Sequence, residues 1–445
     1  MAHAGLQFDP HAARFAAVPL RSYALRCQAC SARFEDDGLV LKCPGEHAPA
    51  LLTSVYSNPR FYRDFRSDGI YRYKNWLPIV RMLSGSGRTV TYRSHKLATV
   101  IGVANLWIAF NGYWPEKGAF LRTATFKELE AYSVLSRVPE LDGRILVLAS
   151  AGNTAAAFAI ACSRNRIPCL IVIPASALNR MQFEGELERC VKIVCLDEPA
   201  DYSDAIELAD RISRHKEFLP EGGVKNIGRR DGIGTTLLNA TETIGQIPSF
   251  YFQAVGSGTG GIAAFEAARR LICDGQFGQG YPRLMLSQNA PFAPMYETWN
   301  SGSRELAEID AQSSKEQIRA IVAGVLSNRK PCFSTVGGVY DALRQTRGEM
   351  LAAENSEALA AADLFEQCEG IDIDPAAGVA LASLIRMAQA GRFAPDDIVL
   401  LHVTGGGWRR HCADHKLIPA RPALRVAGDE CHSDAALAKA LNLFG

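Results

Sequence analysis

Short apolar runs alternate with helix-like stretches along most of the chain. Apolar strands that alternate with helices are typical of parallel βαβ units and of a doubly wound sheet. We therefore predict an α/β protein, with strands at 105–110, 145–149, 169–173, 191–196, 250–255, 283–287 and 398–403 and helices at 154–163, 202–214 and 262–271.

Three other segments are assigned from local signals. Residues 73–78 end in a proline and are predicted to be extended, because the residue before a proline disfavours helical backbone. Residues 307–329 and 350–369 have a helical pattern throughout and are predicted to be helices.

The composition is that of an ordinary globular protein. Of the 445 residues, 48% are apolar and 21% are charged, and 48 basic side chains against 47 acidic ones give a net charge of +1. This composition excludes a disordered chain. The chain also lacks the excess of basic residues that is typical of a nucleic-acid-binding protein. At ~150 residues per domain, the length corresponds to about three domains.

No segment has the pattern of a membrane span or of an export signal. The longest apolar run, 100–110, is shorter than the ~20 residues that cross a bilayer. Residues 1–20 lack a basic stretch followed by a continuous apolar one. We expect a cytoplasmic protein without membrane or nucleic-acid partners, in which the 12 cysteines are reduced thiols.

Two cysteine motifs near the N-terminus have the spacing of metal ligands. Cys27 and Cys30 form a C-x-x-C knuckle, and Cys43 is followed by His47. Thiolates with one imidazole are a common ligand set for structural zinc, as in a zinc ribbon. The second motif has no further cysteine directly after Pro44, so a hairpin with unpaired thiols is the alternative.

A glycine-rich loop at 256–261 follows a predicted strand and opens a predicted helix. Glycines let the backbone approach an anion, and the N–H groups of the helix start point at it. The loop also matches the G-x-G-x-x-G spacing of dinucleotide sites, but the next strand ends in Gln288-Asn289 and offers no acid for a ribose. We predict a phosphate monoester site at Gly256, Ser257, Gly258, Thr259 and Gly260, with a tight turn that binds no ligand as the alternative.

A second loop between a strand and a helix is polar. Ser150, Ala151, Gly152, Asn153 and Thr154 offer hydroxyl, amide and backbone N–H donors at a helix start, which suits a carboxylate. The alternative is an ordinary capped turn, with Asn153 or Thr154 as the N-cap.

Lys127 lies close to a third helix start. Thr125 and Glu128 match a capping box, which would place Lys127 in the first turn of a helix. A cation there opposes the helix dipole, and this favours the neutral amine that a Schiff-base lysine needs. Taken alone, Lys127 would more simply be a solvated surface lysine.

The loop after the last predicted strand begins with Thr404 and continues with three glycines. Its hydroxyl is a candidate partner for a ring nitrogen, and a glycine-rich turn is the alternative.

The segments around these residues resemble a known family. The Lys127 segment, the Ser150–Thr154 loop and the glycine loop resemble those of fold-type II pyridoxal-phosphate enzymes, the threonine synthase group in particular. The strings at 111–120, 126–131, 251–261 and 369–375 resemble those of cysteate synthases, and the similarity extends from about Tyr23 to about Arg410.

The resemblance implies a role for each candidate residue. Lys127 would form the Schiff base with pyridoxal phosphate, Asn153 would bond to the phenolic oxygen, residues Gly256 to Gly260 would hold the phosphate, and Thr404 would meet the pyridine nitrogen. The Ser150–Thr154 loop would also bind the substrate carboxylate.

The resemblance further implies a β-replacement in which O-phospho-L-serine and sulfite give L-cysteate and phosphate, with Lys127 as the general base. Because both the leaving group and the nucleophile are anions, Lys117 and Arg122 are candidate substrate cations by their proximity in sequence. Ala155 and Ala156 stand where cysteate synthases have Gly-Arg. A threonine synthase-like reaction, or another nucleophile on a phosphorylated amino acid, is therefore one alternative. A non-catalytic binder of pyridoxal phosphate or nucleotides is the other.

The resemblance also implies the architecture and the setting. We expect the fold of the tryptophan synthase β type: a tail and zinc-ribbon-like segment at 1–50, a large cofactor-binding domain at 51–129 plus 240–445, and a smaller domain at 130–239. We expect a homodimer that acts in sulfonate biosynthesis, where the product could enter a coenzyme, a sulfonated lipid or a secondary metabolite.

Overall fold

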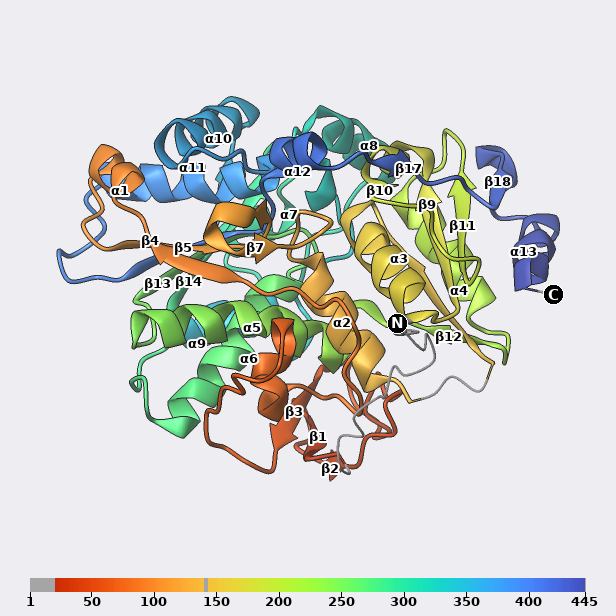
Figure 1. Ribbon diagram of the computed structural model, residues 1–445, viewed down its shortest axis with the longest axis horizontal. Helices are drawn as coiled ribbons and strands as arrows, with labels where there is room; N and C mark the ends of the chain where they lie inside the picture. The colour runs from red at the N-terminus through yellow and green to blue at the C-terminus, as the bar shows by residue number, and fades with distance from the viewer. Residues whose placement is uncertain (1–20, 140–142, 445) are drawn as a thin grey trace, which may run out of the picture.

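Two parallel sheets lie side by side in the computed structural model, which describes residues 21–139 and 143–444 (Figure 1). The predicted tail at 1–20 lies outside the described residues. The predicted α/β class is confirmed, and the predicted strands all occur within one or two residues of the expected bounds.

The larger sheet has six strands. Five of them are parallel and the edge strand β4 is antiparallel to β5. Alternate residues of each strand face two separate apolar cores. Helices α10 and α11 cover one face, and α5, α6 and α9 cover the other (Figure 1). The strand order is β15 (Glu349–Ala353), β14 (Arg283–Asn289), β13 (Phe250–Ala254), β16 (Val399–Val403), β5 (Leu106–Phe110) and β4 (Val90–Arg93).

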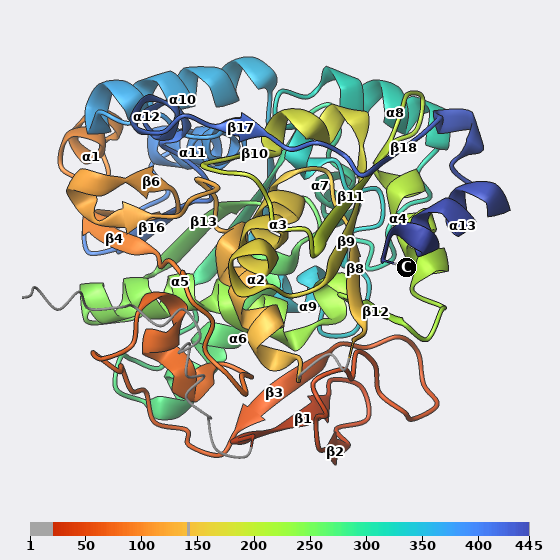
Figure 2. The same ribbon diagram turned by 45° about the vertical axis from the view of Figure 1, so that its right-hand side comes forward.

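The smaller sheet has five parallel strands. Helix α3 packs on one face, and α4 and α13 pack on the other (Figure 2). The strand order is β12 (Phe218–Pro220), β8 (Ile145–Ala149), β9 (Cys169–Pro174), β11 (Val191–Leu196) and β18 (Leu424–Val426).

The helices of the two sheets follow their strands in the chain, as βαβ units require. Their bounds are α1 (Lys96–Ile101), α2 (Lys127–Arg137), α3 (Asn153–Asn165), α4 (Tyr202–Ile212), α5 (Ile227–Ile244), α6 (Thr259–Asp274), α7 (Pro294–Asn300), α8 (Ala311–Ala320), α9 (Val339–Thr346), α10 (Asn355–Glu369), α11 (Pro375–Gln389), α12 (Trp408–Asp414) and α13 (Asp434–Leu441). Two short antiparallel ribbons also occur, formed by β6 (Tyr113–Trp114) with β7 (Ala119–Phe120) and by β10 (Gln182–Phe183) with β17 (Ile418–Pro419).

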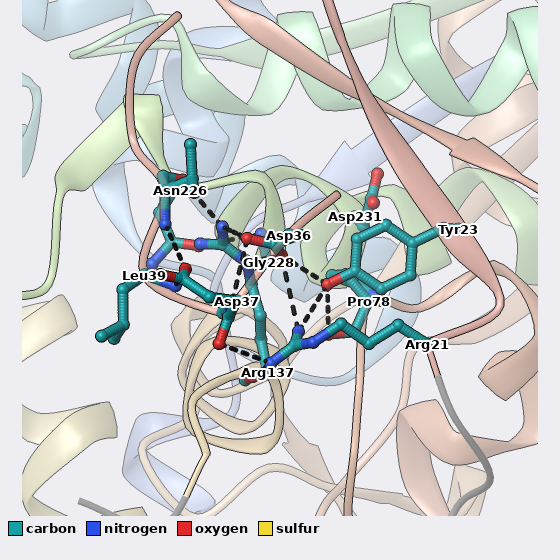
Figure 3. Close-up of polar contacts among 12 residues, drawn as sticks. Arg21, Tyr23, Asp36, Asp37, Leu39, Pro78, Arg137, Asn226, Gly228 and Asp231 are labelled. Carbon is teal, nitrogen blue, oxygen red and sulfur yellow. Dashed lines mark hydrogen bonds and ion pairs between the residues drawn. The ribbon is translucent and has the colours of Figure 1, made fainter. Parts of the chain in front are cut away.

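A small antiparallel sheet at the N-terminal end packs beneath α2, α5 and α6. It contains β1 (Tyr23–Cys27), β2 (Arg33–Phe34) and β3 (Leu52–Tyr56). A buried polar network joins it to α2, because Arg137 at the end of α2 donates two hydrogen bonds to Asp36 and one to Asn226 (Figure 3). The N-terminal segment is thereby fixed to the helix that begins with Lys127.

Three predicted segments differ from the structure. Residues 69–76 form a 3₁₀ helix where 73–78 was expected to be extended, because Tyr71, Tyr73 and Trp76 turn inward to the core. Residues 349–353 form the edge strand β15, so only the second part of 350–369 is helical. Within 307–329, the helix α8 covers ten residues.

The division into domains is kept as a proposal, with two changes at its boundaries. The N-terminal sheet extends to Tyr56, beyond the expected limit at residue 50. The C-terminal segment was expected in the large domain, but β18 pairs with β11 of the smaller sheet and α13 packs against α4. Hydrogen bonding and apolar contact therefore connect residues more than 200 positions apart.

Among the described helices, none combines the length and the apolar character that a membrane crossing requires.

Candidate active site

A cavity of about 800 Å³ is lined from both sheets. Its walls are the loops that follow β8, β13 and β16, together with the start of α2. Ligands of open parallel sheets bind beyond the carboxyl ends of the strands, where these loops meet. The cavity contains Lys127, the Ser150–Thr154 loop, the Gly256–Gly260 loop and Thr404, so the structure brings these predicted residues together.

Lys127 is the first residue of α2, and its amine is largely shielded from solvent. The side chain is 18% exposed, and Nζ donates a hydrogen bond to Glu130 Oε2 at 3.2 Å. Burial lowers the pKa of Lys127, and the nearby Arg229 lowers it further, while Glu130 opposes the shift. A lowered pKa favours the neutral amine, which is the nucleophilic and basic form.

The expected capping box is wrong, although Lys127 does lie in the first turn. The side chain of Glu128 turns back to accept hydrogen bonds from the backbone N–H (2.5 Å) and the hydroxyl (2.9 Å) of Thr123. The helix has Phe126 as N-cap without a side-chain bond. The loop after β16 fixes the start of α2 instead, because the Phe126 N–H donates a hydrogen bond to the carbonyl of Thr404 at 2.9 Å.

Glu130 connects Lys127 to two other walls of the cavity. It is fully buried, accepts a hydrogen bond from Thr154 at 2.9 Å and pairs with Arg229 at 3.0 Å. Arg229 also pairs with Glu221. The two carboxylates raise the pKa of Arg229 although burial opposes this, so the guanidinium stays charged and its charge is neutralised locally.

The Ser150–Thr154 loop opens α3 with unusual backbone geometry. Gly152 has a φ of 137°, which favours glycine, and the Ser150 hydroxyl accepts hydrogen bonds from the N–H groups of Gly152 and Ala155, both at 3.0 Å. The N-cap residue is therefore Gly152, and neither Asn153 nor Thr154, while the Ser150 hydroxyl satisfies the N–H of Ala155 in the first turn. Asn153 lines the cavity.

The glycine loop forms a narrow cradle at the start of α6. Gly258 has a φ of 84°, and a Cβ on Gly260 would lie 1.9 Å from the amide nitrogen of Gln253. The hydroxyls of Ser257 and Thr259 are 2.8 Å apart. Since the first N–H groups of a helix have no partner within it, this cradle offers donors to an anion.

A buried polar layer supports the floor of the cavity. His402 lies in β16, two residues before Thr404, and its ring nitrogens contact the Tyr251 hydroxyl (2.7 Å) and the Asn111 amide (2.8 Å). Burial lowers the pKa of His402 to about 3, so the ring is neutral. Its ring packs against the ring of Phe126, beside Lys127.

Comparison with known proteins agrees with this geometry. Residues 84–405 match the family described as pyridoxal-phosphate dependent enzyme. The chain is 42% identical to the cysteate synthase of Methanosarcina acetivorans over 409 residues, which is 92% of this chain and 97% of that protein. It is 46% identical to the cysteate synthase of Methanosphaerula palustris, over 91% of this chain and 94% of that protein.

The chain belongs to the pyridoxal-phosphate-dependent enzymes, within the cysteate synthase family. The fold agrees with this assignment. Maize serine racemase superposes with a TM-score of 0.56 at 15% identity, covering 73% of this chain and 92% of that one. A fungal L-serine ammonia-lyase from Rhizomucor miehei superposes with a TM-score of 0.55 at 12% identity, covering 74% of this chain and 98% of that one.

The residues present fit the cofactor of this pyridoxal-phosphate enzyme family. An amine with lowered pKa, a glycine cradle at a helix start and the hydroxyl of Thr404 line the same cavity. The loop keeps this shape only with glycines at positions 258 and 260, since a Cβ on either would collide with Val339 or Gln253. The chemistry and the shape of the donor set are those that an aldehyde-bearing phosphate monoester requires.

Two predicted substrate residues lie outside this cavity lining. Lys117 packs its ammonium on the rings of Tyr92 and Trp114, at 4.4 and 5.4 Å from the ring centroids. Arg122 pairs with Glu184 at 3.4 Å. Proximity to Lys127 in sequence was a poor guide here, because the chain turns between Arg122 and Lys127 and the two side chains point to different environments.

Three other lysines line the cavity, and the sequence analysis missed them. Lys42, Lys225 and Lys330 are exposed, and none has a carboxylate within 4.0 Å among the described residues. They come from three distant segments, and no local pattern marks them. The rim therefore has cations that are available to anionic ligands.

Ala155 and Ala156 do not contribute to the cavity wall. Both are buried in the core between α3 and the smaller sheet, at 0% and 3% exposure. In this chain these two positions therefore supply no charge to the cavity.

The predicted metal ligands lie together at the N-terminal sheet. The ligand atoms of Cys27, Cys30, Cys43 and His47 all lie within 4.8 Å of one another. The Cys30 and Cys43 sulfurs are 3.7 Å apart, and Cys27 Sγ is 3.2 Å from His47 Nε2. Tetrahedral zinc with Zn–S bonds of ~2.3 Å places two sulfurs about 3.8 Å apart, so the arrangement fits a zinc ion.

Proposed function

We propose that this member of the cysteate synthase family converts O-phospho-L-serine and sulfite to L-cysteate and phosphate, with pyridoxal phosphate as cofactor. The observation that carries this proposal is the convergence on one cavity of Lys127, a phosphate-sized cradle and exposed lysines. The names of the relatives, which cover almost the whole chain, support it.

Lys127 is the group that moves protons in this proposal. Its shielded amine, with a pKa below the ordinary value, takes the proton from the substrate Cα and returns it after the nucleophile has added. When bound, the cofactor spreads the negative charge that develops at Cα. Glu130 fixes the lysine and, through Thr154, the loop that we propose for the substrate carboxylate.

The cradle and the carboxylate loop orient the reactants. We assign the N–H groups and hydroxyls of Gly256 to Gly260 to the cofactor phosphate, Asn153 to its phenolic oxygen and Thr404 to its ring nitrogen. The donors of Ser150–Thr154 at the start of α3 suit the substrate carboxylate. The exposed lysines of the rim attract the phosphate ester and the sulfite, both of which are anions.

A product assay tests the reaction. Purified protein with pyridoxal phosphate is incubated with O-phosphoserine, with and without sulfite, and cysteate and phosphate are quantified by mass spectrometry. Cysteate that depends on sulfite is the expected result. Phosphate release without cysteate would contradict the nucleophile, and no phosphate release would contradict the leaving group.

The role of Lys127 is tested separately by spectroscopy. Lys127→Ala is expected to lose the absorbance band near ~420 nm that the bound cofactor gives with a lysine. Lys117→Ala is the matched control, because that amine lies outside the cavity lining. A band that persists in Lys127→Ala would refute the assignment.

We also propose structural zinc at Cys27, Cys30, Cys43 and His47. Three thiols and an imidazole within tetrahedral spacing support this choice. Elemental analysis of the purified protein is expected to give equimolar zinc, and the Cys30→Ser variant is expected to lose most of it.

The homodimer remains a proposal that rests on the resemblance to the family, and the cytoplasmic location is a second, separate proposal. Light scattering of the purified holoenzyme tests the first, and cell fractionation tests the second.

A further inference from the structure

The metal cluster and the cavity share one loop. Residues 39–42 lie between β2 and β3 of the N-terminal sheet and line the cavity, and the next residue is the metal ligand Cys43. Lys42 therefore stands directly between the proposed zinc site and the rim of the active site.

The loop is firmly held on its N-terminal side. Asp37 accepts hydrogen bonds from the N–H groups of Leu39 and Val40, at 2.7 and 3.1 Å. The carbonyl of Val40 accepts a hydrogen bond from Arg137 at 2.7 Å, and Arg137 is bound in turn to Asp36 (Figure 3). The chain is thus fixed as far as Val40.

One apolar contact extends this anchor by a residue. A Cβ on Gly222 would lie 2.5 Å from a methyl group of Leu41, so Leu41 packs closely on the backbone of the 221–225 turn. That turn also lines the cavity and carries Lys225.

The C-terminal side of Lys42 is held mainly by the ligand cluster itself and by the packing of Cys43 on the adjacent apolar core. Within the described chain, the backbone of 42–48 forms neither helix nor strand. Its local hydrogen bonds connect near neighbours, such as Gly45 N–H to the Cys43 sulfur at 3.4 Å. The next backbone hydrogen bond to a distant segment is donated by Val336 N–H to the carbonyl of Pro49, at 3.4 Å. An ion held by Cys43 and the other three ligands would tie this side of the loop to β1.

The charge at Lys42 suits the ligands of this cavity. Its side chain is exposed, it lines the cavity, and no described carboxylate lies within 4.0 Å of it. Asp210 also lines the cavity, whereas Glu221 and Asp374 are paired with Arg229 and Arg180. Among the described residues of the rim, the unpaired cations therefore outnumber the unpaired carboxylates, and Lys42 is one of the cations available to an entering anion.

We propose that an ion bound by Cys27, Cys30, Cys43 and His47 holds Lys42 at the rim of the active site, where its ammonium binds the oxyanion of the phosphate ester or of sulfite. This extends the function proposed above and rests on it for the identity of the anion. Lys42 is a binding residue, and the four metal ligands are positioning residues that act through it.

The first experiment observes the loop without measuring activity. The wild-type holoenzyme is treated with endoproteinase Lys-C before chelation, after chelation and after zinc is restored, and the cut after Lys42 is followed by mass spectrometry. Chelation is expected to accelerate this cut by about tenfold or more, and zinc is expected to reverse the effect, because a released loop fits a protease more readily. An unchanged rate would overturn the proposal.

The second experiment separates the metal from the charge by a double-mutant cycle. Lys42→Gln is expected to raise KM for one anionic substrate by about five- to tenfold, with a smaller effect on kcat, and Cys30→Ser is expected to raise the same KM. If the metal acts through Lys42, the double variant is no worse than the more affected single one. If the KM increase of the double variant equals the product of the two single increases, the metal and Lys42 act independently and the proposal is refuted.

Controls make each outcome interpretable. Lys117→Gln removes a lysine outside the cavity lining and should leave both KM values unchanged. Comparing KM for O-phosphoserine with KM for sulfite shows which anion Lys42 binds. Should Cys30→Ser fail to fold, chelated and zinc-restored wild type replace it in the cycle.

Failure of the proposed reaction would look different from failure of this inference. If wild type makes no cysteate, the reaction is wrong, and competition between inorganic phosphate and Lys-C at Lys42 still tests the anion site. Absence of zinc from the purified protein, or equal phosphate binding by wild type and Lys42→Gln in calorimetry, would overturn the inference itself.

Discussion

Replacing Asp36 by Asn tests the buried contact that joins the N-terminal sheet to α2. Asp36 and Arg137 have fully buried side chains, and two hydrogen bonds connect them, from Nη2 to Oδ1 at 2.8 Å and from Nε to Oδ2 at 2.9 Å. The Tyr23 hydroxyl donates to the same carboxylate at 2.5 Å (Figure 3). The variant keeps the shape of the side chain and removes its charge.

The expected loss is large because the guanidinium of Arg137 stays buried without a counter-charge. Removing one partner of a buried pair costs about 3–5 kcal/mol, whereas an exposed pair contributes ~0–1 kcal/mol. Against a typical total of ~5–15 kcal/mol, such a loss is a substantial part of the free energy of unfolding.

The effect also has a defined pH dependence. Burial raises the pKa of Asp36, but the guanidinium of Arg137, together with the hydrogen bonds from the Tyr23 hydroxyl and the Gly38 N–H, brings the net pKa below the ordinary value. The carboxylate therefore stabilises the fold fully above its unfolded pKa of ~3.9, and this contribution is lost as pH falls through the lower folded pKa. The difference between wild type and variant should be complete at neutral pH.

Urea unfolding followed by tryptophan fluorescence measures the loss, since Trp76 shares a core with Tyr23. Glu217→Gln is the control, because its pair with Lys216 is exposed at 3.9 Å and should shift nothing measurable. Adding Arg137→Met to Asp36→Asn should recover part of the loss, since no charge is then stranded. A midpoint shift for Asp36→Asn as small as that of the control, at equal slope, would refute the reasoning.

Three further predictions concern packing, protonation and the rim. Gly232→Ala should destabilise the protein by ~1–3 kcal/mol in urea unfolding, because the added Cβ would lie 2.3 Å from the carbonyl oxygen of Leu129. Gly234→Ala is the matched control: its added Cβ would lie 3.4 Å from the nearest atoms, so this variant should be neutral or slightly stabilising. Burial raises the pKa of Glu128 to about 7, whereas the unfolded pKa is ~4.3. Between these two pH values the folded state holds a proton that the unfolded state has lost, so the free energy of unfolding should fall as pH rises. Urea midpoints of Glu128→Gln, measured over the same pH range, should lack that decline. Lys225→Gln should raise KM for O-phosphoserine and weaken its dependence on salt, as steady-state kinetics at two ionic strengths would show, and an unchanged KM would exclude this lysine from the rim.

Local sequence patterns were sufficient for most elements and for the loops of the site. Apolar runs predicted strands such as β9 and β13, because a strand that is buried on both faces consists of consecutive apolar residues. The strand–loop–helix order likewise placed Lys127, Ser150–Thr154 and Gly256–Gly260 at the carboxyl edge of the sheets, where they line one cavity.

The same local reasoning failed where distant partners decide the conformation. Thr125 and Glu128 have the spacing of a capping box, yet Glu128 bonds to Thr123 and the carbonyl of Thr404 holds the helix start. Residues 349–353 become a strand because β14 offers them a free edge. A pattern within a few residues carries no information about such partners.

Short-range periodicity and motifs were enough to establish the fold class, the family and the residues that are candidates for binding or catalysis. Which charges act together depended on the packing of the whole chain. Packing buried the amine of Lys127 beside Glu130 and directed Lys117 to two aromatic rings, and it brought Lys42 and Lys330 to one rim. The physical reason is that solvation and electrostatic interaction depend on distance in space, and packing sets that distance between residues hundreds of positions apart.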